Sequence, residues 1–327
     1  MNVLEILIER VGYSVIQDLG RPGRGNLGIS ENGAGDQGAA RLANALVGNA
    51  EHFPLIEVIA SELAFTAQTT LLIAVTGAAN KVLIDDQPHN TYETLVISAG
   101  SAVKILAPEH GQRAYLSING QIQVEKILDS AAPDSFLEFG QRLFSGSKIL
   151  IQSQITDSIF GNELPIFRFP VIRPNFTHVV NLKATIGPDL NRLKDGATSF
   201  DQQFEVLPQS DHVGMRLTGS NLDLVEADEI LSRGVPIGAV EVPPSGELII
   251  LLRGRLVTAG YPVVAVLSKD SIDRASQAKA GDLISISLID LKQAQSEIQA
   301  KDDEFQEIKK RVTNAFSSRG LEKLLSL

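Results

Sequence analysis

The stretch GVPIGAVEVPPSGELIILLRGRLVTAGYP (234–262) sets the expectation for the fold. Leucine and isoleucine dominate its part 247–257, and Pro-Pro and Gly-Tyr-Pro flank that part, which is typical of a β-strand between turns. Similar apolar runs recur along the chain, each bounded by Gly, Pro, Asp or Asn: LLIAVTG (71–77), TLVISAG (94–100), AVKIL (102–106), RAYLSING (113–120), KILIQ (148–152), VVAVL (263–267) and LISISLI (283–289). The sequence therefore predicts a mainly β protein with few helices.

Two segments have helical spacing instead. DQGAARLANALVGN (36–49) begins with Asp36 as a candidate N-cap and ends at a Gly-Asn stop. A stripe of apolar residues predicts a longer helix over 291–316; it consists of Leu291, Ala294, Ile298, Phe305, Ile308, Val312 and Phe316. We expect this helix to lie at the periphery of the β structure.

A weak internal repeat in the sequence indicates two related units. Asp18 is followed by Gly-Ala and then an acid at Asp36, and Asp211 is followed by Gly-Ala and then an acid at Glu241. Each copy then reaches an apolar strand. With the prolines late in 153–176 as a join, the pattern predicts a first β unit with additional strands over 1–160, a second over 161–290, and a helical segment over 291–327.

Composition narrows the possible functions. The 327 residues are 43% hydrophobic and 21% charged, which is typical of a globular protein. The net charge of -10 argues against nucleic acid or an anionic membrane as a partner. The chain has no cysteine, so disulfides and thiol catalysis are excluded. Neither a secretion signal nor a long apolar span is visible, and we expect a cytoplasmic protein.

The stretch QDLGRPGRGNLGISENGAGD (17–36) combines backbone freedom with charge. Its glycines permit close backbone approach to an anion, and Asp18 and Arg21 lie among them as candidate binding residues. The spacing matches neither a phosphate-binding loop nor a dinucleotide fingerprint. The alternative is a series of tight turns that these two side chains cap.

A second candidate site is SDHVGMRLTG (210–219), which contains Asp211, His212 and Arg216. An exposed arginine there would bind a carboxylate or phosphate, whereas the more common outcome is a salt bridge to Asp211 or Glu241. None of the five histidines pairs with another at metal-ligand spacing, so no metal site is predicted.

A third candidate is TAGYP (258–262). Thr258, Gly260 and Tyr261 would present a hydroxyl, a bare amide and a phenol to one ligand. The alternative is a bend between two strands with a partly buried tyrosine.

Together these motifs resemble the family of biotin-dependent carboxyltransferases, or allophanate hydrolase subunit 2, which includes the C component of 5-oxoprolinase and the KipA-like proteins. The similarity lies in three ordered blocks, 12–49, 210–219 and 234–282, and runs from about residue 5 to 290. The resemblance implies two cyclophilin-like β-barrel units in tandem. It also implies two partners: a KipI-like protein, which resembles allophanate hydrolase subunit 1, and a LamB/YcsF-type protein.

The resemblance implies one of two functions. The first is a component, like the C component, of an ATP-dependent 5-oxoprolinase, which opens the lactam of 5-oxoproline to glutamate, or of a related complex that activates an amide. The alternative is a non-catalytic, KipA-like protein that holds a KipI-like partner. ATP would act in the complex. Biotin would arrive on another chain, because Met1 and Met215 are the only methionines and no lysine is flanked by two of them.

The resemblance also assigns roles to residues. Arg21 and Arg216 would hold an anionic group, and Glu241 or Asp36 would accept a proton if burial raises its pKa. The catalytic candidates are Asp36, Arg216, Glu241 and Tyr261; the substrate-binding candidates are Asp18, Arg21, Asp211, His212, Thr258 and Gly260.

Several polar positions depart from the family pattern. The usual Ser-Gly-Ala-Met-Asp begins here with Asn32, and Ser-Asp-Arg ends in His212. The usual Asp-Arg-Gln-Thr begins with Gly254 and carries Leu256 and Val257 in place of Gln-Thr. Glycines are kept while polar groups change, which favours an altered substrate or a binding role.

Overall fold

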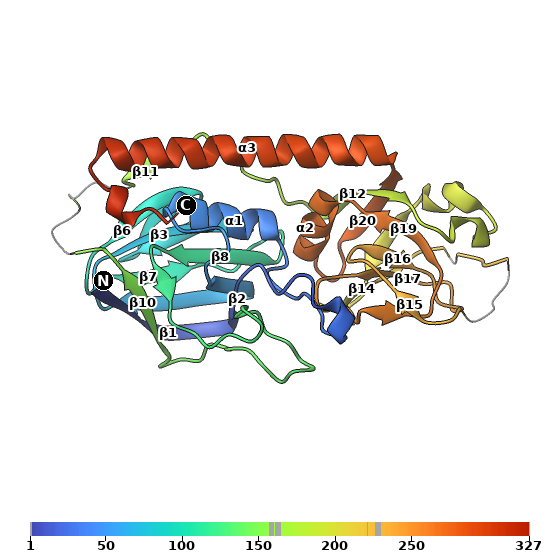
Figure 1. The fold of residues 1–327 in the computed structure, drawn as a ribbon, viewed down its shortest axis with the longest axis horizontal. Helices are drawn as coiled ribbons and strands as arrows, with labels where there is room; N and C mark the ends of the chain where they lie inside the picture. The colour runs from blue at the N-terminus through green and yellow to red at the C-terminus, as the bar shows by residue number, and fades with distance from the viewer. Residues whose placement is uncertain (1, 157–159, 161–164, 221, 226–229, 327) are drawn as a thin grey trace. The chain divides into compact units, whose positions relative to one another are not determined.

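The computed structural model describes residues 2–156, 160, 165–220, 222–225 and 230–326 and divides into two compact units (Figure 1). Unit 1 comprises Met1–Gly20, Gln37–Asn175 and Asp303–Leu327, and unit 2 comprises Arg21–Asp36 and Phe176–Asp302. These units differ from the contiguous segments 1–160, 161–290 and 291–327 expected from the sequence, because residues 21–36 of the glycine-rich stretch belong to unit 2 and residues 303–327 belong to unit 1. The boundary before Phe176 falls at the end of the expected join, of which 157–159 and 161–164 lie outside the described residues.

Unit 1 is built on one eleven-stranded sheet. Its strands are β1 (Asn2–Gln17), β2 (Leu55–Ala67), β3 (Leu71–Gly77), β4 (Lys81–Ile84), β5 (Gln87–Asn90), β6 (Glu93–Ile97), β7 (Ala102–Ile105), β8 (Arg113–Ile118), β9 (Gln121–Ile122), β10 (Lys148–Ser153) and β11 (Phe167–Arg168). The main path runs β11-β6-β3-β8-β2-β1-β10-β9. The apolar run 71–77 forms all of β3, which is buried on both faces: Ile73 and Val75 pack in the main core, and Ala74 packs against Leu46.

Helices complete the core of unit 1. Helix α1 (Gln37–Leu46) packs Leu46 against Ala74 of β3. Helix α3 (Leu291–Ser318) adds Ile308, Val312 and Phe316 to the main core. The short helix η4 (Glu322–Leu324) follows it. The peripheral C-terminal helix expected from the sequence is confirmed, although Leu291, at its start, is exposed rather than part of the buried stripe.

Unit 2 is a closed barrel in the order β12-β19-β16-β17-β14-β13-β20. Its strands are β12 (Val179–Ile186), β13 (Gln203–Val206), β14 (Gly214–Thr218), β16 (Ala239–Glu241), β17 (Leu248–Leu251), β19 (Val263–Leu267) and β20 (Leu283–Leu288). A separate ribbon pairs β15 (Arg233–Gly234) with β18 (Thr258–Ala259). Short helices η1 (Gly25–Leu27), η2 (Leu190–Arg192) and η3 (Gly196–Phe200) lie in the connections. The mainly β fold is thus confirmed.

Alternation along β16 decides what faces the barrel interior. Val240 and Val242 belong to the interior core together with Ile250 and Val264. Because successive side chains of a strand point to opposite faces, Glu241 points outward from the barrel. The functional candidate on this strand therefore lies on the outer surface of the barrel wall.

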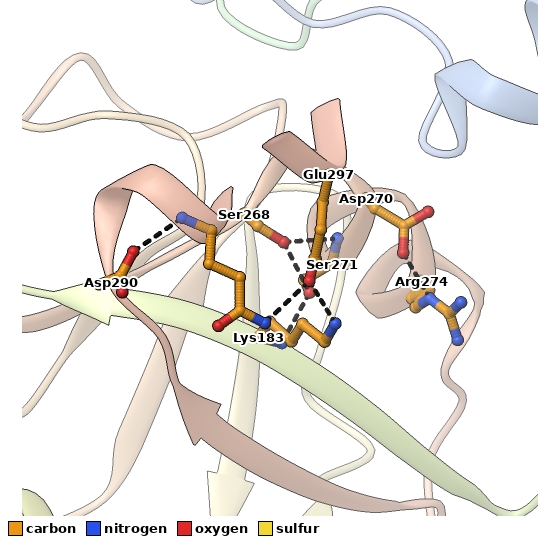
Figure 2. A network of polar contacts seen from close by, with 8 residues as sticks. Lys183, Ser268, Asp270, Ser271, Arg274, Asp290 and Glu297 are labelled. Carbon is orange, nitrogen blue, oxygen red and sulfur yellow. Dashed lines mark hydrogen bonds and ion pairs between the residues drawn. The ribbon is translucent and has the colours of Figure 1, made fainter. Parts of the chain in front are cut away.

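Helix α2 (Lys269–Gln277) was not expected from the sequence, because its residues are mostly polar. Ser268 caps its first turn by accepting a hydrogen bond from the backbone N–H of Ser271. Figure 2 shows the surrounding network: the Ser271 hydroxyl accepts from the Lys183 backbone N–H at 2.7 Å, and Lys183 Nζ contacts Glu297 at 2.6 Å. These contacts fix α2 and the first turns of α3 to strand β12.

The long strand expected over 247–257 ends early in the structure. Strand β17 stops at Leu251, and the residues after it leave the barrel. Arg253 and Arg255 there bind the glycine-rich loop: the Asn32 N–H donates to the Arg253 carbonyl at 3.1 Å, and the Ser30 hydroxyl donates to the Arg255 carbonyl. The backbone groups of this segment are satisfied by a loop rather than by a neighbouring strand.

Candidate functional site

Glu241 lies in a row of outward-facing residues that crosses the barrel wall. It is paired with Val263 of β19 on one side, just after a register shift that follows Val240, and with Ile249 of β17 on the other. Ile249 is paired in turn with Arg216 of β14. Because directly opposed residues share a face of the sheet, Val263, Glu241, Ile249 and Arg216 form one row. Neighbouring strands are about 4.8 Å apart, so Glu241 and Arg216 are separated by roughly 10 Å.

The β15–β18 ribbon contributes to the apolar layer around this row. Val235, which follows β15, and Ala259 of β18 pack in one cluster with Ile249 and Val263. Since Ile249 and Val263 flank Glu241 on the same face, the carboxyl group lies within an apolar layer. Glu241 is accordingly only 2% exposed.

This environment perturbs Glu241 strongly. Among the residues that the structure describes, none forms a hydrogen bond with its Oε1. Burial raises the pKa of Glu241 to about 7, and the nearby positive charge of Arg233 only partly opposes that effect. At neutral pH the group is therefore divided between acid and carboxylate, which suits a residue that transfers protons.

Asp189 organises one end of the row and was missed by the sequence reasoning. Its carboxylate binds Arg233 of β15 and accepts from the Val263 backbone N–H at 2.7 Å. It thereby positions the cation whose charge acts on Glu241. The only sequence signal was the turn-like Gly187-Pro188-Asp189, which resembles many ordinary turns.

The TAGYP candidate lies next to Glu241. Thr258 pairs with Gly234 in the ribbon, and the Pro262 carbonyl accepts from the Val242 N–H at 3.1 Å. Gly260 and Tyr261 form the bend between β18 and β19, and Tyr261 is 43% exposed. The structure therefore brings this motif to the strand that carries Glu241.

Arg216 occupies the exposed end of the row. The expected alternative, a salt bridge to Asp211 or Glu241, is wrong, because its ion-pair partner is Glu247 at 3.8 Å. Both side chains of that pair are more than 40% exposed, so the contact is weak. The guanidinium group remains accessible to an anion.

Asp211 and His212 serve local geometry. Asp211 accepts from the backbone N–H groups of Val213 and Gly214 at 2.8 and 3.0 Å, which closes the turn before β14. His212 packs against Gly254, where an added Cβ would overlap the imidazole ring. Two departures from the family pattern, at positions 212 and 254, are thus in direct contact.

The glycine-rich loop is divided between the two units. In unit 2, the buried Arg21 donates its backbone N–H to the Glu31 carbonyl at 2.8 Å. Asp36 accepts from Gln277, at the end of α2, at 2.9 Å. The structure thus places Asp36 beside α2 and not in the row of Glu241. Asn32, a family departure, has a positive φ of 53°, which asparagine tolerates better than most residues.

In unit 1, Asp18 is an anchor. Its carboxylate accepts from the Ser130 hydroxyl at 2.6 Å and from the backbone N–H groups of Ala131 and Gly20 at 2.7 and 2.8 Å. Three donors occupy both oxygens of this buried group. The alternative of a turn-capping role describes its contacts better than substrate binding.

The described residues contain no group of three or more His, Cys, Asp or Glu side chains arranged to hold a metal ion. Within the same residues, no helix is long and apolar enough to cross a membrane.

The chain belongs to the family described as carboxyltransferase domain, subdomain A and B, whose model matches residues 27–287. It is 30% identical to the 5-oxoprolinase C component of Haemophilus influenzae over 86% of this chain and 90% of that protein. It is 28% identical to the 5-oxoprolinase C component of Escherichia coli over 92% of this chain and 96% of that protein. The resemblance inferred from the sequence is confirmed.

Solved structures share the fold. TTHA0988 matches 88% of this chain with a TM-score of 0.76 and 27% identity, and the chain spans 56% of the length of that protein. Urea amidolyase of K. lactis matches 93% of this chain with a TM-score of 0.82 and 22% identity, and the chain spans 20% of that protein. The latter likeness concerns the fold alone.

Proposed function

We propose that this chain is one component of an assembly that activates an amide, and specifically the C component of an ATP-dependent 5-oxoprolinase. The observation that carries the proposal is Glu241, a buried acid with a pKa of about 7 in a motif kept from the family. The relatives named as this 5-oxoprolinase component match nearly their whole length, which supports a role in the same kind of assembly. A KipI-like protein and a LamB/YcsF-type protein would complete it.

Glu241 would move the proton that the reaction needs. Opening a lactam to glutamate forms a carbon–oxygen bond from water at the carbonyl carbon and breaks the carbon–nitrogen bond, and the departing nitrogen must gain a proton to leave as an amine. A carboxyl group with a pKa near neutrality is still protonated often enough to supply that proton and is basic enough to recover it. Arg233, held by Asp189, would stabilise the carboxylate that remains after the transfer.

Arg216 would hold an anionic group at the open end of the same row. Its weak, exposed contact with Glu247 leaves the guanidinium free to exchange partners. Any ATP would be bound by the assembled complex, and biotin would be carried by another chain.

The experiment is ATP-dependent release of glutamate from 5-oxoproline by the chain reconstituted with its KipI-like and LamB/YcsF-type partners. We expect release to require this chain and to fall at least ~100-fold in Glu241→Gln, the usual scale of acid–base catalysis. Glu205→Gln is the matched control, because Glu205 is an exposed glutamate of the same barrel. An unchanged rate in Glu241→Gln would contradict the assigned role.

A non-catalytic, KipA-like binding role is the second candidate. It is favoured by the altered 254–257 segment, in which Leu256 is 52% exposed where the family pattern has a polar residue. This role predicts a stable complex with the KipI-like partner that releases no glutamate with or without Glu241. Release by the wild-type complex would exclude it.

A further inference from the structure

Arg255 is a buried cation that no carboxylate of the described residues contacts directly. It is 7% exposed, and its Nε donates to the Val235 carbonyl at 3.0 Å. Within the described part of the chain, no acceptor lies at hydrogen-bond distance from its buried Nη1. Burying a guanidinium group without a counterion is costly, so proteins rarely retain one unless something binds it.

The neighbouring Arg253 shows the ordinary arrangement. It is buried to a similar extent, but its Nη2 binds Asp273 at 2.7 Å and its Nε donates to the Gly35 carbonyl at 3.1 Å. Two arginines in one segment thus differ in one respect: within the described residues, Arg253 has a carboxylate partner, and the side chain of Arg255 has a single carbonyl. The difference points to an external partner for Arg255.

Defined contacts hold Arg255 in place on two sides. The glycine-rich loop binds the Arg255 carbonyl through Ser30, and both residues are buried. On the other side, Val235 joins the apolar layer that contains Ile249 and Val263, next to Glu241. Burial lowers the pKa of Arg255, and the main opposing influence is the charge of Glu31 in the loop, which forms no ion pair with it among the described residues.

We propose that Arg255 binds a small carboxylate-type oxyanion through its terminal guanidinium nitrogens, next to the Val235 carbonyl that its Nε already engages. With Nε engaged by Val235, the remaining edge of the guanidinium group offers parallel N–H donors that match a planar carboxylate. The segment from Arg233 to Val235 links the two sites, since the charge of Arg233 acts on Glu241 and the Val235 carbonyl accepts a hydrogen bond from Arg255. An anion at Arg255 would therefore be bound near the proton-transferring group.

Only the choice of 5-oxoproline as a probe rests on the proposed function. The carboxylate would come either from 5-oxoproline or from bicarbonate, and the two sources are separable. The lactam 2-pyrrolidinone has the ring of 5-oxoproline without its carboxylate and serves as the control ligand.

The experiment is calorimetric titration of the full chain with 5-oxoproline, 2-pyrrolidinone and bicarbonate. We expect at least one of the two oxyanions to bind, 2-pyrrolidinone not to bind, and Arg255→Gln to weaken anion binding at least tenfold. Arg274→Ala is the matched control, because Arg274 is an exposed arginine of the same unit that pairs with Asp270, and it is expected to change this binding less than threefold.

Glu31→Gln keeps the test decisive if Arg255→Gln does not fold. Removing the negative charge that acts on Arg255 should tighten anion binding several-fold without altering the core, because the Glu31 side chain is only half-buried. Binding of bicarbonate but not 5-oxoproline would uphold the site and contradict 5-oxoproline as the substrate. If neither anion binds, or if binding is unchanged in both Arg255→Gln and Glu31→Gln, the site is overturned.

Discussion

Two buried carboxylates, one in each unit, look alike in the sequence and differ in the structure. Asp18 of unit 1 is 4% exposed and Glu241 of unit 2 is 2% exposed. Asp18 receives three hydrogen bonds, whereas Oε1 of Glu241 receives none from the described residues. Burial alone therefore does not separate an anchor from a reactive group; the supply of donors does.

The arginines repeat this contrast. Arg253 is paired with Asp273 and bound to the loop, while the side chain of Arg255 has, among the described residues, only the Val235 carbonyl. Asp18 and Arg253, whose side chains are satisfied, each hold a segment in place. Glu241 and Arg255, each of which has a buried polar atom without a partner among the described residues, lie in or next to the apolar cluster of Val235, Ile249 and Val263. Substitution of the satisfied member of each pair should therefore cost stability, whereas the unsatisfied member is expected to serve chemistry or binding and to oppose stability.

The largest expected effect is on the satisfied cation. Arg253→Ala should lower the free energy of unfolding of unit 2 by about 3 kcal/mol, because it removes the ion pair with the largely buried Asp273 and the hydrogen bond to the Gly35 carbonyl. Hydrogen exchange of the barrel amides would measure the loss. Arg274→Ala is the control: its ion pair with Asp270 is exposed, and we expect a change of about 0.5 kcal/mol or less.

The next largest loss of stability should come from Asp18, the buried carboxylate that acts as an anchor in unit 1. Asp18→Ala leaves three donors without their acceptor, of which the Ser130 hydroxyl and the Ala131 N–H are buried. We expect a loss of about 3 kcal/mol in unit 1, by the same exchange measurement. Asp211→Ala, which opens an exposed turn, should cost about 1 kcal/mol or less. Equal losses in the two variants would remove the distinction between anchor and surface turn.

Glu241 should affect stability in the opposite direction. Between its unfolded pKa near 4.5 and its folded pKa of about 7, the native chain holds a proton that the unfolded chain has lost, so stability falls as pH rises. The penalty is absent below about pH 4.5, grows through about pH 7 and is complete about one pH unit above it, where it amounts to about 3 kcal/mol. Glu241→Gln should remove this pH dependence in denaturant unfolding between about pH 4.5 and 8.5. A variant with the wild-type pH slope would argue against a perturbed Glu241.

The smallest effect concerns the paired departures from the family. Gly254→Ala should destabilise unit 2 by about 1–2 kcal/mol, because the new methyl group overlaps His212, and His212→Ala should restore most of that loss. Gly25→Ala is the control, since its added Cβ would meet nothing closer than 4.0 Å. Additive losses in the double variant would show that the two positions are independent.

Much of the fold was predictable because its signals are local. The apolar run 71–77 became β3 in full, and the stripe from Phe305 to Phe316 became the buried face of α3. Two errors arose where tertiary contacts override the local pattern. The strand expected through residue 257 ends at Leu251 because the glycine-rich loop binds the segment after it. Helix α2 was not predicted because its residues are mostly polar and form no clear apolar stripe. Its one local signal is the N-cap residue Ser268.

The site was predictable only in part. Family motifs selected Glu241 and Arg216, but strand register, which no local pattern specifies, puts them in one row. Asp189 and Arg255 were missed because their importance lies in the groups that surround them. The sequence alone does not show whether the aspartate of a Gly-Pro-Asp turn, or an arginine that follows a strand, has a partner for its side chain.

The central claim is that Glu241 titrates near neutrality within an apolar layer. The most direct test is a ¹³C NMR titration of the full chain with carboxyl-labelled glutamate, in which the Glu241 signal is assigned by its absence from Glu241→Gln. The structure predicts a midpoint near pH 7 for that signal. A midpoint near 4.5, the ordinary value for glutamate, would contradict the assignment of Glu241 as the proton-transferring residue.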